Sequence, residues 1–190
     1  MKDRTILLNF ANDFMKYATR VIGADGIHSR IRRAIYPDCA PIYSGQLAVT
    51  SSAQRSDMSF PASGEYKLPA FIFTNPGAFL MLPHDPKGEQ AGIGTQWKFE
   101  ERDKAGWATL AGDKNQLMDM LGSDYEHWPK IARSCLDMAK PEDLGIWPYS
   151  TLPRLNNWIT ADNRIIIIDD AQHGIAPTAG QGACMAIEDA

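Results

Sequence analysis

The chain of 190 residues is 44% hydrophobic and carries a formal net charge of −4 at pH 7. This composition predicts a globular protein with a buried core and excludes nucleic acid as an expected partner, because only Arg30, Arg32 and Arg33 form a basic cluster. The three widely spaced cysteines predict no metal site and fit a reducing, cytoplasmic setting, and the longest aliphatic run, Ile165–Ile168, is too short to span a membrane.

The N-terminal elements are short. Ile6–Phe10 is predicted to form a strand, and Thr19–Ala24 a second strand that stops at Asp25-Gly26. The stretch between these strands is helix-like or irregular. Ser29–Ile35 then has the pattern of a short helix, which Pro37 ends.

The middle of the chain has strand patterns. Leu68–Thr74 and Ala78–Leu82 are apolar runs separated by Asn75-Pro76-Gly77, which is typical of an antiparallel hairpin. In Ala91–Phe99, apolar and polar or glycine residues alternate, as expected for a strand with one covered face.

Two helices and a buried strand are predicted further along. Asp113 followed by Gln116 resembles a capping box before one helix, and a second helix begins near Pro129 and ends at Pro141. Arg164–Ile168 is predicted to be a fully buried parallel strand that leads into a glycine-bearing loop and a helix.

The stretch Val21–Arg32 carries the first set of chemically informative residues. Gly26 permits a tight turn, and Asp25 can accept hydrogen bonds from backbone amides or from a sugar hydroxyl. Arg32 can pair with a carboxylate or a pyrophosphate through two parallel bonds. The same residues also fit an ordinary strand, turn and helix with a capping aspartate and a surface arginine.

The stretch Ile165–Ala190 carries the second set. Asp170 lies at the tip of the predicted buried strand, where α/β sheets bind cofactors and where a carboxylate can accept hydrogen bonds from ribose or ribityl hydroxyls. Gly180, Gln181 and Gly182 then open a helix of small residues, whose unpaired amides could face an anion such as the reduced flavin.

With both sets of residues in order, the chain resembles the FAD-dependent hydroxylases of the para-hydroxybenzoate and salicylate hydroxylase kind. The residues that match the family's two motifs are Asp25, Gly26, Ser29, Arg32, Asp170, Ala171, His173, Pro177, Gly180, Gln181, Gly182, Glu188, Asp189 and Ala190. Trp158–Arg164 resembles the lead-in to the family's flavin strand. The resemblance implies an α/β fold with α+β character, in which a partial, Rossmann-like FAD-binding domain accompanies an antiparallel-sheet substrate domain. The implied division places FAD-binding segments at residues 1–40 and 158–190 and the substrate domain at residues 41–157.

The resemblance also implies roles. Asp170 would bind the ribityl chain, Pro177 would lie beside the isoalloxazine ring, and Gly180–Gly182 would supply amides to its pyrimidine edge. Asp25, Gly26 and Arg32 would serve the cofactor region and the coupling to NAD(P)H. No side chain is expected to be catalytic, because the flavin, once NAD(P)H has reduced it, activates oxygen and hydroxylates a small aromatic substrate. The candidate walls of the substrate pocket are Phe71, Phe73, Phe79, Met81 and Trp97, although core packing is the alternative role for each.

The sequence departs from the family pattern in ways that keep other hypotheses open. No GxGxxG follows an N-terminal strand, so we expect a fragment that lacks the unit holding the ADP half of FAD and also the C-terminal region, with a partner chain as one source of the missing half. Asp169 stands where the family has glycine, and two adjacent carboxylates would repel a pyrophosphate unless one takes up a proton or turns to solvent. The alternative is that Asp169 is a solvent-facing residue at the end of the strand. The alternative hypotheses are a non-catalytic remnant that no longer binds FAD, and a flavoprotein with other chemistry, such as a dehydrogenase or halogenase.

Overall fold

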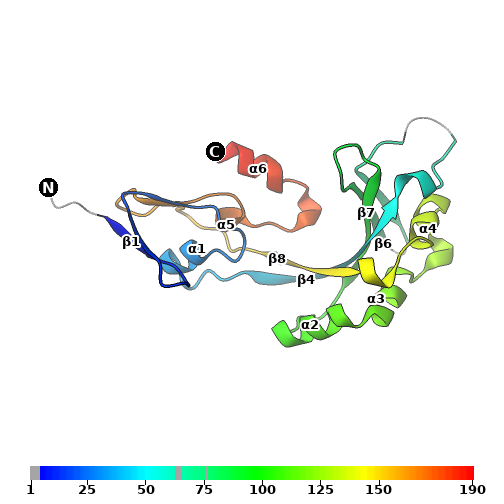
Figure 1. The fold of residues 1–190 in the computed structure, drawn as a ribbon, viewed down its shortest axis with the longest axis horizontal. Helices are drawn as coiled ribbons and strands as arrows, with labels where there is room; N and C mark the ends of the chain where they lie inside the picture. The colour runs from blue at the N-terminus through cyan, green and yellow to red at the C-terminus, as the bar shows by residue number, and fades with distance from the viewer. Residues whose placement is uncertain (1–4, 63–65, 76) are drawn as a thin grey trace. The chain divides into compact units, whose positions relative to one another are not determined.

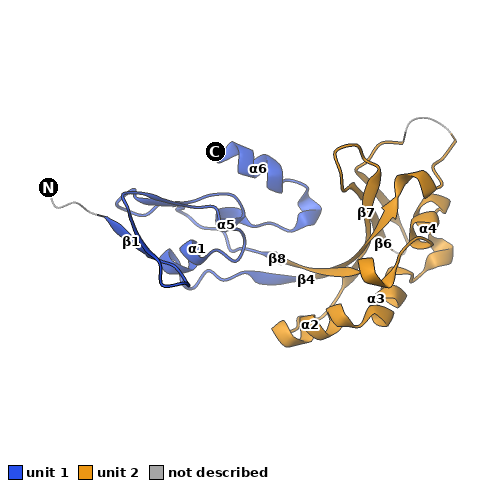
Figure 2. Cartoon of the chain, viewed as in Figure 1, with its two compact units in different colours: residues 1–44, 150–190 blue, residues 45–149 orange. Residues whose placement is uncertain are grey.

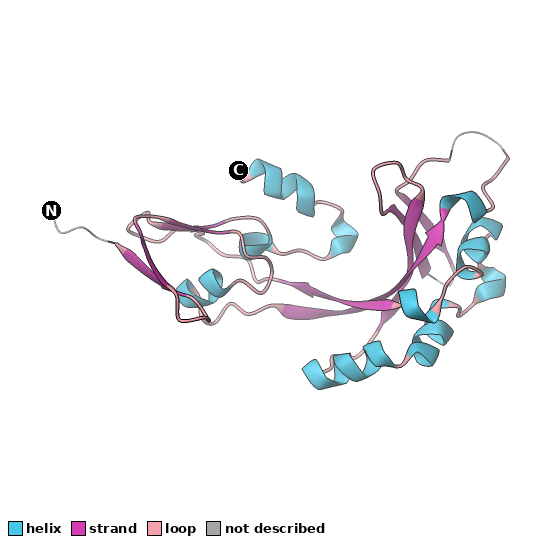
Figure 3. Cartoon of the chain, in the orientation of Figure 1, coloured by secondary structure: helices cyan, strands magenta, loops and turns pink. Residues whose placement is uncertain are grey.

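The computed structural model describes residues 5–62, 66–75 and 77–190 (Figure 1). The chain divides into two compact units, which Figure 2 distinguishes: unit 1 comprises residues 1–44 and 150–190, and unit 2 comprises residues 45–149. Helices and strands are mixed in both units (Figure 3). No helix among the described residues is long and apolar enough to cross a membrane.

Unit 1 contains two small sheets, and short helices follow its parallel strands. Its strands are β1 (Ile6–Asn9), β2 (Met15–Ala18), β3 (Val21–Gly23) and β9 (Ile165–Ile167), and its helices are α1 (Arg30–Ile35), α5 (Asp170–His173) and α6 (Gly182–Glu188). Strands β3 and β9 pair in parallel, with Val21 opposite Ile165 and Gly23 opposite Ile167. The predicted parallel strand before Asp169 is therefore confirmed, but it is not fully buried, because only Ile167 of its three residues is buried.

The stretch between β1 and β3 differs from the prediction. It contains β2, which pairs antiparallel with β1, rather than a helix-like or irregular segment. A tight turn joins the two strands: the Phe10 amide donates to the Phe14 carbonyl at 2.9 Å, and Asp13 has a φ of 61°. The sequence does not indicate β2 because three of its four residues are exposed. Its apolar and polar side chains therefore do not alternate as they do in a strand with one buried face.

Unit 2 is built on a five-stranded sheet with the strand order β5-β6-β7-β4-β8. Its strands are β4 (Ile42–Gln54), β5 (Ala70–Thr74), β6 (Gly77–Pro83), β7 (Gln90–Lys98) and β8 (Gly145–Thr151), of which β4 begins and β8 ends in unit 1. The β5–β6, β6–β7 and β4–β7 pairs are antiparallel. The predicted hairpin is confirmed in β5 and β6, although Pro76 of its turn lies outside the described residues.

Three helices bury one face of this sheet. They are α2 (Lys104–Gly112), α3 (Lys114–Leu121) and α4 (Lys130–Leu136). The core cluster joins Leu47 and Phe79 of the sheet to Leu110, Leu117 and Ile131 of the helices. The predicted cap of α3 is confirmed, because Asp113 Oδ1 accepts from the Gln116 amide at 3.0 Å.

Helix α2 and strand β4 are not among the predicted elements. Only Leu110 is fully buried in α2, so the helix lacks a continuous apolar stripe, and its start is marked by Asp103, whose carboxylate accepts from the Gly106 amide at 2.7 Å. In β4 the small polar residues Ser51 and Ser52 interrupt the alternation of apolar side chains. The mixed class with an antiparallel sheet is nonetheless the predicted one.

Candidate functional site

The loop after β3 is organised by Asp25. Its carboxylate accepts hydrogen bonds from the Ser29 hydroxyl, from the Arg30 amide at 2.8 Å and from the Ile31 amide at 3.4 Å. Partial burial acts to raise the pKa of Asp25, but these hydrogen bonds outweigh it and leave the pKa below its ordinary value. Gly26, with a φ of 76°, makes the turn. The geometry is that of a carboxylate that caps the N-terminus of α1.

Arg32 lies on α1 with 1% of its surface exposed. Its guanidinium group donates four hydrogen bonds, all to main-chain carbonyls: to Cys39 at 3.2 Å, Pro153 at 2.8 Å, Ala171 at 3.1 Å and Gln172 at 2.6 Å. No described carboxylate accepts from it. The expected pairing of Arg32 with a carboxylate or pyrophosphate is therefore not what the structure has, because a planar five-donor group is already directed at carbonyls of three separate segments.

The chain leaves β9 through Asp169, which has an unusual backbone conformation. Its φ is 55° and its ψ is −147°, in a region that is essentially restricted to glycine. Its carbonyl accepts from the Gln172 and His173 amides at 2.8 and 3.0 Å and so starts α5. This backbone geometry gives a structural reason for the glycine that the family resemblance implies at this position.

Asp170, the first residue of α5, presents a half-buried carboxylate. Burial and the neighbouring charge of Asp169 raise its pKa above the ordinary value, and His173 lowers it less. No hydrogen bond from a described residue reaches this carboxylate. A partly buried acceptor without a protein donor fits a ligand that brings its own hydroxyl groups, as the ribityl chain of a flavin does.

The glycine-bearing loop follows α5. Pro177 starts a short 3-10 turn, Pro177–Ala179, and Gly180 comes next with a φ of 63°. A Cβ built at Gly180 would meet no atom within 4 Å, so the glycine is required by the backbone conformation and leaves open space beside it. Gln181 precedes α6, and Gly182 is its first residue. The contact of these residues with a flavin stays a prediction.

A second acidic residue joins the two ends of this loop. Asp189, at the end of α6, accepts with Oδ2 from the Asp169 amide at 2.6 Å and lies 2.7 Å from His173 Nε2. The Asp169 amide lowers the pKa of Asp189 most strongly, and His173 lowers it further. Both His173 and Asp189 belong to the matching motif, but the sequence shows only their separation, and nothing in it indicates that they touch.

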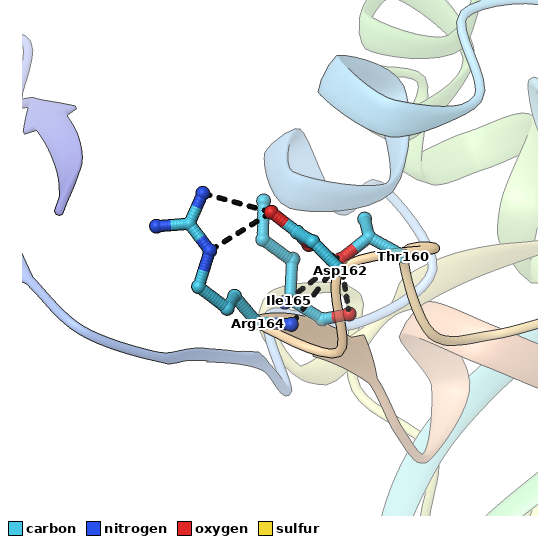
Figure 4. A network of polar contacts seen from close by, with 4 residues as sticks. All are labelled: Thr160, Asp162, Arg164 and Ile165. Carbon is cyan, nitrogen blue, oxygen red and sulfur yellow. Dashed lines mark hydrogen bonds and ion pairs between the residues drawn. The ribbon is translucent and has the colours of Figure 1, made fainter. Parts of the chain in front are cut away.

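The turn before β9 is held by a compact polar network, which Figure 4 shows. Arg164 donates from Nε and Nη2 to Asp162 Oδ2, both at 2.8 Å, while the Thr160 hydroxyl donates to Asp162 Oδ1 at 2.7 Å. The Ile165 amide donates back to the Thr160 hydroxyl at 3.1 Å. These contacts set the direction in which the chain enters β9 and therefore reaches Asp170.

The five candidate pocket residues divide between the two faces of the unit 2 sheet. Phe79 and Met81 have no exposed surface and pack under the helices, and Trp97 packs partly buried against the same core. Phe71 and Phe73 lie on the opposite face, 44% and 77% exposed, with their rings stacked 6.4 Å apart. The prediction that Phe79 and Met81 line a pocket is therefore wrong for this structure, because alternate residues of a strand point to opposite faces.

The face of the sheet opposite the core, the outer face, carries further polar and aromatic groups besides Phe71 and Phe73. The side-chain amide of Gln96 donates to the Tyr149 hydroxyl at 3.1 Å. Trp147 packs edge-on against Tyr149 with ring centroids 5.6 Å apart. Sequence reasoning missed these three residues. The alternation of β7 could have placed Gln96 opposite the buried Ile93 and Thr95, but the sequence of β8 indicates only an extended segment.

The sequence was compared with known protein families and with curated proteins. No family model matches the chain. Hispidin-3-hydroxylase of Neonothopanus nambi is 25% identical over 205 residues, covering 96% of this chain and 46% of that protein. An FAD-dependent monooxygenase of Aspergillus nanangensis is 29% identical over 185 residues, covering 90% of this chain and 39% of that protein. The chain resembles FAD-dependent aromatic hydroxylases.

The fold of this chain is also found in a solved structure. Klebsiella pneumoniae HpxO, complexed with FAD and uric acid, is 16% identical and aligns with a TM-score of 0.76 over 97% of this chain and 44% of its own. At this identity the match establishes the fold alone. The chain spans less than half the length of the two curated relatives from Neonothopanus and Aspergillus.

Proposed function

We propose that this chain is the flavin- and substrate-contacting part of an FAD-dependent monooxygenase that uses NAD(P)H to hydroxylate a small aromatic or similarly electron-rich substrate. The observation that carries this proposal is Asp170: a half-buried carboxylate at the end of a parallel strand, with no donor among the described residues, followed at ten residues by Gly180 in its open, left-handed conformation. Similarity to curated FAD-dependent hydroxylases over at least 90% of the chain supports it.

Residues of unit 1 would hold the flavin. Asp170 would accept hydrogen bonds from ribityl hydroxyls, Pro177 would lie against the ring system, and the backbone amides of Gly180, Gln181 and Gly182 would face its pyrimidine edge. When bound, FAD would accept a hydride from NAD(P)H and would allow one oxygen atom of O2 to be transferred to the substrate. The protein's own contribution is to bind and orient the cofactor and to exclude water.

Asp25, Gly26 and Arg32 would support this arrangement indirectly. Asp25 holds the start of α1, and Arg32 on the same helix donates to the carbonyls of Ala171 and Gln172, directly after Asp170. Because these two carbonyls belong to α5, the position of the Asp170 carboxylate depends on Arg32 even though Arg32 itself need not touch FAD. A role in coupling to NAD(P)H would act through the same contacts.

The outer face of unit 2 is the proposed substrate surface. Phe71 and Phe73 offer stacked, exposed rings against which a planar aromatic substrate can pack, and the half-buried Gln96, which donates to the buried Tyr149 hydroxyl, supplies a polar group on that face. Phe79 and Met81 would support the sheet from beneath.

We propose that residues outside these 190 form the binding site for the ADP half of FAD. The sequence contains no GxGxxG, the motif with which related flavoproteins bind the pyrophosphate. A further segment of the same polypeptide or a separate partner chain could supply it. FAD should therefore bind this chain more weakly than it binds an intact hydroxylase.

A second candidate is a folded remnant that no longer binds FAD. The specific observation in its favour is Asp169, which adds a negative charge beside Asp170 and holds a backbone conformation suited to glycine. This role would leave the chain as a module that packs against a partner.

Spectroscopy of the purified chain with added FAD separates the two candidates. A monooxygenase portion should quench flavin fluorescence on titration and shift the flavin absorbance bands, and Asp170→Ala should abolish both changes. Addition of a chain that carries a GxGxxG unit should then permit NAD(P)H oxidation and incorporation of one atom of labelled oxygen into the product. The absence of any bound flavin at FAD concentrations far above the protein concentration would favour the remnant.

A further inference from the structure

The contacts of Asp189 point to a positioning role for two residues that hold no cofactor themselves. The Asp189 carboxylate lies against the Asp169 amide and the His173 ring, with 23% and 18% of the Asp189 and His173 side chains exposed. A carboxylate can only accept, so His173 must donate from Nε2. Both bonds are short, as expected for hydrogen bonds to a charged acceptor.

These bonds close a loop. Asp169 precedes α5 and His173 is its last residue, whereas Asp189 directly follows α6, so one carboxylate joins the two ends of the segment 174–188. Within that segment lie Pro177, Gly180 and Gly182. At its start the segment is held by the Leu152 amide, which donates to the Gly174 carbonyl at 2.8 Å. Beyond Gly174 its hydrogen bonds are local: the Gly180 amide donates to the Pro177 carbonyl at 3.1 Å, and the Met185 amide donates to the Gln181 carbonyl at 2.9 Å.

Few other forces hold α6 in place. None of its residues is fully buried, and Ile187 is 77% exposed. A helix of seven residues is too short to be stable without tertiary contacts. The position of the loop in this structure therefore depends strongly on the two hydrogen bonds at its ends.

We infer that His173 and Asp189 form a clamp that holds the glycine-bearing loop in its flavin-binding position. The inference rests on the proposed function for the identity of the ligand, but the clamp itself is a property of the unliganded chain. Loss of these two hydrogen bonds would let α6 move, and the open space beside Gly180 would then no longer be kept in place. The energetic consequence is a loss of preorganisation, which weakens binding without removing any direct ligand contact.

Amide hydrogen exchange in the unliganded chain tests the clamp. Loss of hydrogen bonds to a charged group should make the Gly180 and Met185 amides exchange about tenfold faster in His173→Ala and Asp189→Ala. His173→Gln should restore slow exchange, because the glutamine amide nitrogen can replace Nε2. Glu188→Ala is the matched control: it removes an exposed acidic side chain from the same helix end and should leave exchange unchanged.

A double variant supplies the decisive comparison. If the pair acts as a unit, His173→Ala combined with Asp189→Ala should accelerate exchange much less than the product of the two single effects. The clamp is overturned if both single variants exchange as slowly as the parent, if Glu188→Ala exchanges as fast as Asp189→Ala, or if the two effects multiply fully.

Titration with FAD then tests the link to the cofactor. His173→Ala and Asp189→Ala should raise the Kd for FAD about tenfold, and His173→Gln should keep it within about threefold of the parent. If the parent binds FAD and the clamp variants bind it equally well, the positioning role is overturned while the proposed function stands. If the parent binds no FAD, the proposed function and the positioning role for flavin both fail, and the exchange data still decide whether the clamp exists.

Discussion

Asp169→Gly is expected to stabilise this protein, although glycine usually weakens a fold. Asp169 has a φ of 55° and a ψ of −147°, and such a conformation costs a residue with a Cβ about 1–3 kcal/mol. Glycine relieves this strain but loses about 0.5–1 kcal/mol through the greater freedom of the unfolded chain. No described residue forms a hydrogen bond with the Asp169 side chain, and the amide bond to Asp189 is kept in the variant. The net gain is therefore about 1 kcal/mol.

The measurement is thermal or urea unfolding of the chain. A gain of that size corresponds to a rise in Tm of about 2–4 °C for a protein of this length. Asp169→Ala is the matched control, because it removes the carboxylate but keeps the Cβ and hence the backbone strain. Its stability should stay within about 0.5 kcal/mol of the parent.

The same pair of variants separates strain from charge. Removing the Asp169 charge takes away one cause of the raised pKa of Asp170, so both variants should bind FAD with similar, improved affinity. Only Asp169→Gly should gain stability. Equal stabilisation by glycine and alanine would show that the charge, not the backbone conformation, is the source of the effect. A glycine variant that is less stable than the parent would contradict the inferred strain in the Asp169 backbone.

Three other perturbations test different parts of the structure. Arg32→Lys should lower the free energy of unfolding by about 2–4 kcal/mol, because lysine keeps the charge but cannot reach the four carbonyls at once, and a loss below about 1 kcal/mol in urea unfolding would contradict this. Phe79→Ala should cost about 3–5 kcal/mol, whereas Phe73→Ala should change stability by less than about 0.5 kcal/mol and alter substrate affinity instead; the reverse order would mean that the two faces are misassigned. Because the pKa of Asp189 is lowered, its carboxylate stabilises the fold above the ordinary value of 3.8, and this contribution is lost as the pH falls through the lower, folded-state pKa. Asp189→Asn should therefore show a smaller loss of stability between neutral pH and about pH 3 than the parent, and an equal loss in both would exclude Asp189 as its source.

Much of the local structure follows from the sequence, because neighbours in the chain decide it. The aliphatic run Ile165–Ile167 forms a parallel strand, and Asp113 caps its helix as its spacing with Gln116 indicates. The order of the two motifs around Asp25 and Asp170 is also sufficient to indicate the resemblance to FAD-dependent hydroxylases. The apolar composition of the strand and the spacing of the cap are local features, which the sequence shows directly.

The tertiary structure decided the partners of the polar groups and the faces of the sheet. Arg32 donates to carbonyls more than a hundred residues away, at Pro153, Ala171 and Gln172, and no local pattern distinguishes these acceptors from a pyrophosphate. The sequence predicts that successive apolar side chains along β5 and β6 point to alternate faces. It does not show which face the helices cover, and this decides that Phe79 is buried while Phe71 is exposed. Likewise, the contact of Asp189 with His173 forms only when the end of α6 lies against the end of α5. Such long-range contacts depend on the packing of whole elements, so the sequence by itself indicated candidate residues for the chemistry, and the fold determined what each of them touches.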